Sequence, residues 1–126
     1  SISASPALAG SAVVTGAISD NAVFAGYKGK RIIYTGSGDA TFSIPDATVT
    51  VAVGDTWVIV NASQQTITLD PVSGDNTIKI ATGSAYGGSD GTGSVGVNIS
   101  IAKGGVAELV VVANHEFAIF GSGISQ

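Results

Sequence analysis

The sequence predicts an all-β domain, specifically an antiparallel, jelly-roll-like β-sandwich with an extended N-terminal arm. Apolar and polar residues alternate along several short segments, turn motifs separate these segments, and no segment of convincing length has helical periodicity. Short connections favour antiparallel neighbours. The 126 residues suffice for one domain with its own core.

The first 26 residues differ from the rest in being small, repetitive and without a charged side chain before Asp20. We expect residues 1–26 to form an arm or an added edge strand, and residues 27–126 to form the sandwich. Apolar side chains of the arm are the candidates for docking on a partner. They are Ile2, Leu8, Val13, Val14 and Ile18.

Five segments alternate with period two and are predicted to be strands with one buried face and one solvated face. β-branched residues, which suit a pleated surface, dominate these segments. The side chains expected on the buried faces are Phe42 and Ile44; Val49, Val51 and Val53; Ile67 and Leu69; Ile78 and Ile80; and Val95, Val97, Ile99 and Ile101.

Three further runs are apolar on both faces: Trp57–Val60, Leu109–Ala113 and Phe117–Phe120. Such runs are typical of central strands of a sandwich, or of strands pressed against a neighbouring subunit. Trp57 is expected in the core. Asn114 and His115 separate the last two runs and predict a tight hairpin, with Asn114 tolerating a positive φ.

The segment Thr82–Ser94 is a long glycine-rich loop, which in a compact domain is either functional or mobile. Tyr86 and Asp90 are its candidate contacts with a glycan or a protein partner, because an aromatic ring can stack on a sugar. The alternative is that Tyr86 packs onto its own domain. Residues 87–93 are a single copy of a glycine–aspartate pattern that binds calcium only in tandem repeats.

Catalytic chemistry is not expected. The chain has no Cys and one His, so thiolate metal sites are excluded and triads and zinc sites lack partners. His115 is expected in a turn, and Asp70 and Asp75 are expected to cap turn amides rather than bind calcium. We therefore predict no enzyme activity, no cofactor and no metal; a depolymerase fragment is the residual enzymatic alternative.

Charge is sparse, with nine acids, five bases and a net charge of −4. Nucleic acid is not expected as a partner, since a phosphate backbone requires a broad basic face. No apolar run approaches the length that spans a bilayer. Lys28, Lys30 and Arg31 form the one basic cluster, which is either a solvated strand entry or a source of ion pairs with a partner.

The segments TFSIPDA, GDTWVIVNASQQTITLDPVSGDNTI and SIAKGGVAELVVVANHEFAIFGSG, in this order, resemble a small β module of tailed-bacteriophage virion proteins. The resemblance covers about Gly29 to Gly123. Those modules have a strand followed by Pro, a Gly…Phe/Trp-x-x-x-Asn strand and a Thr-Ile-x-Pro…Gly-Asp-x-Ile segment. They end with a Gly-x-x-x-x-Leu-Val segment, an aromatic-rich last strand and a Gly.

This resemblance implies a non-enzymatic structural virion protein that is often a homotrimer. The absence of heptads and of a long shaft favours a capsid decoration (cement) protein that binds the major capsid protein or another virion protein. The alternative is a tail-fibre or receptor-binding module for a host surface glycan. The expected location is the virion, on the capsid surface or the tail.

Overall fold

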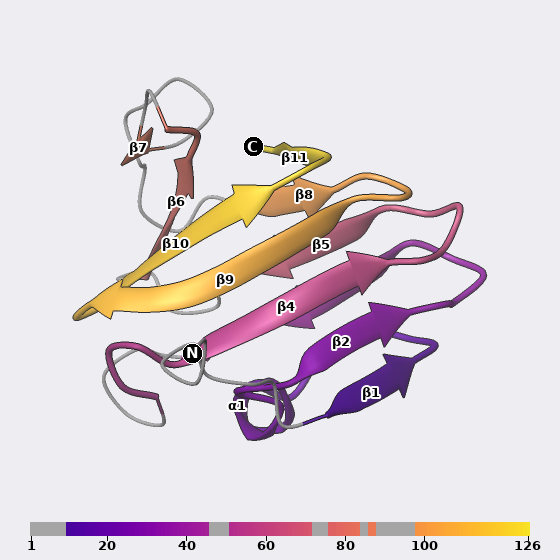
Figure 1. Ribbon diagram of the computed structural model, residues 1–126. Coiled ribbons are helices and arrows are strands. Elements are labelled where there is room, and N and C mark those ends of the chain that lie inside the picture. The colour runs from indigo at the N-terminus through magenta and orange to yellow at the C-terminus, as the bar shows by residue number, and fades with distance from the viewer. Residues whose placement is uncertain (1–9, 46–50, 72–75, 84–85, 88–97) are drawn as a thin grey trace, which may run out of the picture.

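The computed structural model describes residues 10–45, 51–71, 76–83, 86–87 and 98–126, which fold into two β-sheets that face each other (Figure 1). The all-β prediction is confirmed. In chain order the elements are β1 (Ser11–Val14), α1 (Asn21–Gly26), β2 (Arg31–Tyr34), β3 (Ala40–Ser43), β4 (Thr56–Asn61), β5 (Ile67–Asp70), β6 (Thr77–Ala81), β7 (Tyr86–Gly87), β8 (Ile99–Ile101), β9 (Val106–Ala113), β10 (Glu116–Gly121) and β11 (Ile124–Ser125).

The larger sheet has seven strands in the order β1-β2-β4-β9-β10-β6-β7, and the smaller has four in the order β11-β8-β5-β3. Both sheets are mixed, because β1–β2, β2–β4, β3–β5 and β6–β10 pair in parallel. Strictly antiparallel pairing was therefore wrong, and a jelly-roll order is not confirmed. From β2 to β6 successive strands alternate between the two sheets. The connections between these strands therefore cross from one sheet to the other. When the chain comes back to a sheet, the new strand runs parallel to the previous strand of that sheet, as β4 does to β2 and β5 to β3.

The hairpin predicted at Asn114–His115 joins β9 to β10 and is confirmed. The positive φ, however, belongs to His115, at 59°, and not to Asn114. The register shifts between Glu116 and Phe117, as in a β-bulge. A bulge adds one residue and local twist, which lets this pair continue for the length of both strands.

The core between the sheets centres on Trp57, which is fully buried as expected. Its ring centroid lies 5.1 Å from that of Phe24 and 6.3 Å from that of Phe117. Phe24 comes from α1, a short helix that was not predicted from the sequence. Asp20 begins this helix by accepting a hydrogen bond from the backbone N of Ala22 at 2.9 Å, and Trp57 Nε1 donates to the Phe24 carbonyl at 2.9 Å.

Most of the alternating segments bury the side chains that period two assigned to the core. Those confirmed as buried are Phe42, Ile44, Val51, Ile67, Leu69, Ile78, Ile80, Ile99 and Ile101. Val49, Val95 and Val97 lie outside the described residues. The prediction that Val53 lies on a buried face was wrong, because Val53 is 69 % exposed and lies in a turn. Asp55 closes this turn, since its N–H donates to the Ala52 carbonyl at 3.0 Å and its carboxylate accepts from the Ala52 N–H at 2.9 Å.

The described part of the N-terminal segment packs on the domain. β1 lies at the edge of the larger sheet, parallel to β2. Ile18 bridges to β3, with its N–H donating to the Thr41 carbonyl at 3.1 Å and its carbonyl accepting from the Ser43 N–H at 2.7 Å. From residue 10 onward this segment therefore contributes an edge strand, a core residue and a helix to the fold.

Candidate functional site

The side of the seven-stranded sheet that points away from the core is predominantly apolar. We call it the outer face and define it by the residues that alternate with buried ones along β1, β2, β4, β9 and β10. Its apolar members are Val13, Ile33, Val58, Val60, Val106, Val110, Val112 and Phe120. The ladder pairs Val13 with Ile33, Ile33 with Val60, and Val60 with Val106, so one apolar row crosses four strands.

Several of these side chains are open to solvent. Val13 is 66 % exposed, Val106 and Phe120 are each 43 % exposed, and Val112 is 38 % exposed. The other exposed large apolar side chains in the described part are Val23 of α1 and Val53 of a turn. Isolated exposed apolar residues are ordinary, whereas a contiguous set on one sheet face is typical of an interaction surface.

The corresponding side of the four-stranded sheet is polar. Its outward positions are Thr41, Ser43, Thr68, Asp70, Ser100 and Ser125. Thr41 pairs with Thr68, and Thr68 pairs with Ser100, so hydroxyl groups form a continuous row. Hydroxyl and carboxylate groups are well hydrated, which suits this side to water.

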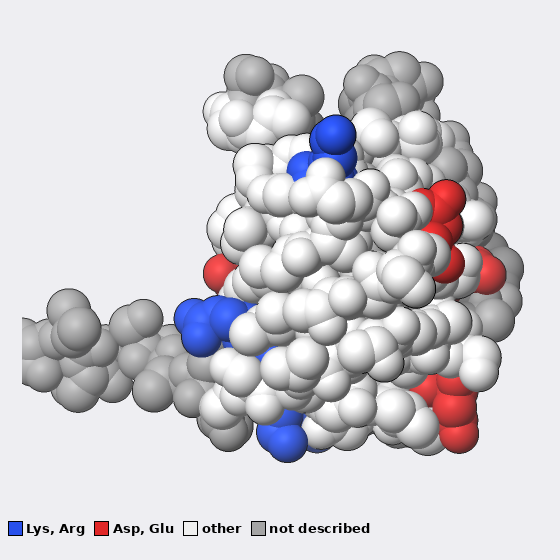
Figure 2. Space-filling model, turned by 90° about the vertical axis from the view of Figure 1, so that its right-hand side faces the viewer, with Lys and Arg blue, Asp and Glu red and all other residues white. Residues whose placement is uncertain are grey.

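Charges are few on the outer face. Lys79 Nζ and Glu116 Oε1 form an ion pair at 3.3 Å toward its β6 side. Arg31 and Glu108 are not in an ion pair with any described residue, and Glu108 accepts a long hydrogen bond from Thr56 Oγ1 at 3.4 Å. Figure 2, which views one end of the molecule, likewise shows acidic and basic groups as small, separate clusters on a largely uncharged surface.

The basic cluster of Lys28, Lys30 and Arg31 is divided by the structure. Lys28 Nζ lies 3.8 Å from Asp55 Oδ2, and its side chain is 52 % exposed, which describes a weak surface ion pair. Arg31 opens β2 on the outer face and is exposed. Of the cluster, Arg31 is thus the residue placed among exposed apolar side chains.

The candidate docking residues of the arm occupy different environments. Val13 lies on the outer face, while Val14 is partly buried against the core. Ile18 is only 5 % exposed, so its side chain belongs to the core and is not presented to a partner. Ile2 and Leu8 lie outside the described residues.

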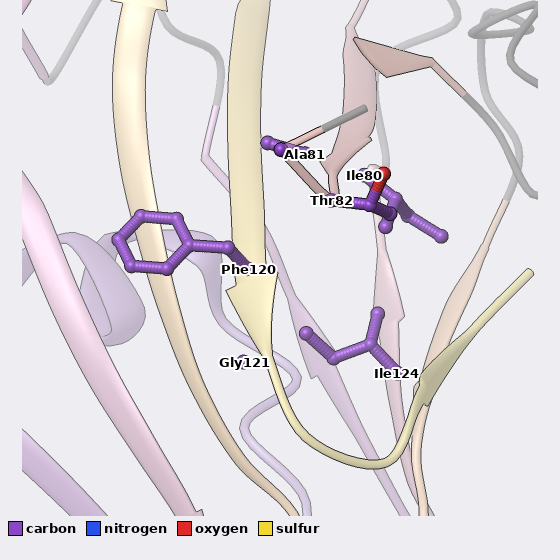
Figure 3. Close-up of a pocket in the computed structure, with 7 residues that line it drawn as sticks. Ile80, Ala81, Thr82, Phe120, Gly121 and Ile124 are labelled. Atoms are coloured by element: carbon purple, nitrogen blue, oxygen red, sulfur yellow. The ribbon is translucent and has the colours of Figure 1, made fainter. Parts of the chain in front are cut away.

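Of the candidate loop contacts, Tyr86 begins β7, where its backbone pairs with Ala81, and Asp90 lies outside the described residues. Nearby is an open pocket of about 550 Å³ whose lining residues come from β6, β10 and β11 and the turn after β6. In Figure 3 the ring of Phe120 lies on the opposite side of β10 from Ile80 and Ile124. Thr82 is the one polar side chain of the lining. This pocket therefore offers little of the convergent hydrogen bonding with which sugars are recognised.

Polar side chains are in contact next to the β9–β10 hairpin. His115 Nδ1 lies 3.3 Å from Asn76 Oδ1, next to the hairpin where a turn role was expected, and the Asn76 side-chain amide donates to the Pro45 carbonyl at 3.1 Å. Within the described residues, no group of three or more His, Cys, Asp or Glu side chains is placed to hold a metal ion. None of the helices described there is long and apolar enough to cross a membrane.

The outer-face residues that the sequence predicts as contacts are Val13 of the arm and Arg31 of the basic cluster. The runs that are apolar on both faces add to these, since contact with a neighbouring subunit is one of their two interpretations. β9 is a central strand of the larger sheet that is apolar on both faces, since Leu109 and Val111 are buried and Val112 is exposed. Glu108 could not be identified from the sequence, because its position across β4 from Arg31 depends on the register of three strands.

Comparison with known proteins adds no relative to this picture. No protein-family model, no curated protein and no solved structure matches the chain.

Proposed function

We propose that this chain is a non-enzymatic structural protein that acts by association, through the outer face of its seven-stranded sheet. The observation that supports this is the apolar row from Val13 to Val106, set against the hydroxyl row on the opposite side of the molecule. Burying apolar area is the main driving force of protein association. A sheet with one apolar face toward the core and a second toward solvent fits a protein that buries the second face in an assembly.

Within this class, we propose a capsid decoration protein of a tailed bacteriophage, on the strength of the sequence resemblance. The partner would be the major capsid protein or another virion protein, and the resemblance implies a homotrimer. The edge strand β1 is suited to strand addition, in which an extended segment pairs with an exposed sheet edge. The uncharged residues before it, with Ile2 and Leu8, would extend that contact.

The direct test is to purify virus particles from cells that produce this chain from its native genome. Mass spectrometry should find the chain in the particles at high copy number, and immunogold labelling should place it on the head. Absence of the chain from purified particles would overturn the virion assignment without affecting the evidence for association.

A tail-fibre or receptor-binding module is the second candidate. Its candidate contact is Tyr86 of β7, whose backbone pairs with Ala81 of the pocket lining, although that lining offers a single polar side chain, Thr82. Immunogold label on the tail, together with glycan-array binding that Tyr86→Ala abolishes, would favour this candidate. Label on the head with no glycan signal would reject it.

A further inference from the structure

We infer that two copies of this chain pack face to face through the outer face, about a two-fold axis along β4, with Arg31 of each copy opposite Glu108 of the other. This inference goes beyond the proposed function, because it names the occupant of the outer face as a second copy. It replaces the homotrimer that the sequence resemblance implies with a two-fold dimer, and it does not require that the chain be a virion protein.

The inference begins with one row of the outer face. Arg31 of β2 pairs in register with Val58 of β4, which pairs with Glu108 of β9, which pairs with Phe120 of β10. A cation and an anion therefore lie on either side of β4, each one strand away. Neighbouring strands are about 4.8 Å apart, which separates the Arg31 and Glu108 backbones by about 10 Å.

A two-fold axis along β4 exchanges β2 of one copy with β9 of the other. Arg31 then faces Glu108 of the second copy, and Glu108 faces Arg31 of the second copy, so the two ion pairs form together. In the next row Ile33 faces Val106 of the second copy, and Val60 faces its own equivalent. Such a surface is self-complementary, as an isologous interface requires.

Charge also selects the direction of the axis. A two-fold axis across the strands at this row would place Arg31 opposite Arg31 and Glu108 opposite Glu108. Opposed like charges are unfavourable across an interface. The axis along β4 is therefore the two-fold arrangement that pairs both charges.

The dimensions fit sheet packing. Facing sheets pack about 10 Å apart with strands crossing at about 30°, a gap that arginine and glutamate side chains can bridge from opposite sides. Five strands at about 4.8 Å and a six-residue β4 give a flat area of about 500 Å² per copy. That is at the small end of specific interfaces, so we expect a dimer that dissociates on dilution.

The test uses two charge-reversal variants of the whole chain, Arg31→Glu and Glu108→Arg, with Lys103→Glu as the control. Lys103 is exposed in the turn between β8 and β9, is not one of the outer-face residues, and its reversal changes net charge as Arg31→Glu does. Sedimentation equilibrium over a wide range of concentration gives the dissociation constant of each protein. Circular dichroism checks that each variant is folded.

Each reversal alone should weaken self-association by at least about tenfold, because it opposes like charges twice in the dimer. The control should associate as the wild type does. Mixing the two variants should restore a dimer, since each then supplies the charge that the other needs. Val60→Lys places two cations opposite each other on the axis and should be monomeric. This variant tests the same interface if a reversal variant does not fold.

Three results would overturn the inference. The first is a wild-type chain that is monomeric at every concentration or forms trimers. The second is a reversal variant that associates as tightly as the control. The third is a mixture of folded variants that stays monomeric. None of these results depends on whether the chain is found in virus particles.

Discussion

The two sheets share one core but present opposite kinds of surface. The four-stranded sheet turns Thr41, Thr68 and Ser100 outward, while the seven-stranded sheet turns Val60, Val106 and other apolar residues outward. In both sheets, every second side chain along a strand faces the core, and most of these side chains are apolar. The difference shows that the apolar outer face is not a consequence of strand propensity, because Thr is as suitable as Val at an outward strand position.

The free energy at stake explains why this face matters. Full burial of a Val or Phe side chain is worth about 1.5–3 kcal/mol. Val106, Val112 and Phe120 are each more than a third exposed, so part of that free energy is not realised within one chain. Association through the outer face would therefore release more free energy than association through the hydroxyl-lined face of the four-stranded sheet, which serves as the comparison.

The largest expected effect on the free energy of unfolding comes from comparing substitutions on the two faces of β4. Ile59→Ala removes a fully buried side chain and should lower the free energy of unfolding by about 2–5 kcal/mol. Val60→Ala, one residue on, should lower it by roughly 1 kcal/mol or less, because Val60 points away from the core. Urea denaturation at concentrations where the chain is monomeric measures both. Equal losses would mean that the outer face contributes to folding as the core does.

An intermediate effect is expected at the start of α1. Asp20→Ala removes the side chain that caps this helix and should lower the free energy of unfolding by about 0.5–2 kcal/mol. Self-association should not change, because α1 is not part of the outer face. Asp20→Asn is the matched control and should retain most of the stability. A change in dissociation constant for Asp20→Ala would show that folding and association are not separable in this chain.

The smallest effect on folding is expected on the outer face itself. Val106→Thr and Val112→Thr together keep the β-branched shape and give this face the chemistry of the opposite one. Each change should alter the unfolding free energy by only about 0.5 kcal/mol. The wild-type urea midpoint should rise with protein concentration, as expected when folding is linked to self-association, and that of the variant should not.

The reverse change, Thr41→Val with Thr68→Val, adds apolar groups to the four-stranded sheet and tests whether any such pair suffices. We expect the concentration dependence to match that of the wild type. A new concentration dependence would show that the outer face has no special role.

The sequence predicted most of the side chains that face the core but, apart from the β9–β10 hairpin, not which strands are neighbours. Alternation at Ile67 and Leu69 or at Ile99 and Ile101 identifies a buried face from local pattern alone. It contains no information on whether a short connection turns within a sheet or crosses to the other. For that reason the parallel pairs of β2 with β4 and of β3 with β5 were not foreseen.

The elements that were missed have weak local signals. At six residues α1 is too short for helical periodicity, and Asp20 was its one visible mark. Ile18 reads as part of an uncharged arm, but pairing with β3 buries it. At the candidate site, Arg31 was identified as a possible ion-pair partner, while Glu108 becomes its counterpart only through strand register.

The solution mass of the unmodified chain tests the central claim most directly. Light scattering at high protein concentration should give about 24.6 kDa, twice the chain mass of 12.3 kDa, falling toward the monomer on dilution. A mass of about 36.9 kDa, three chains, would support association but reject the two-fold arrangement. A mass of 12.3 kDa at every concentration would contradict self-association through the outer face.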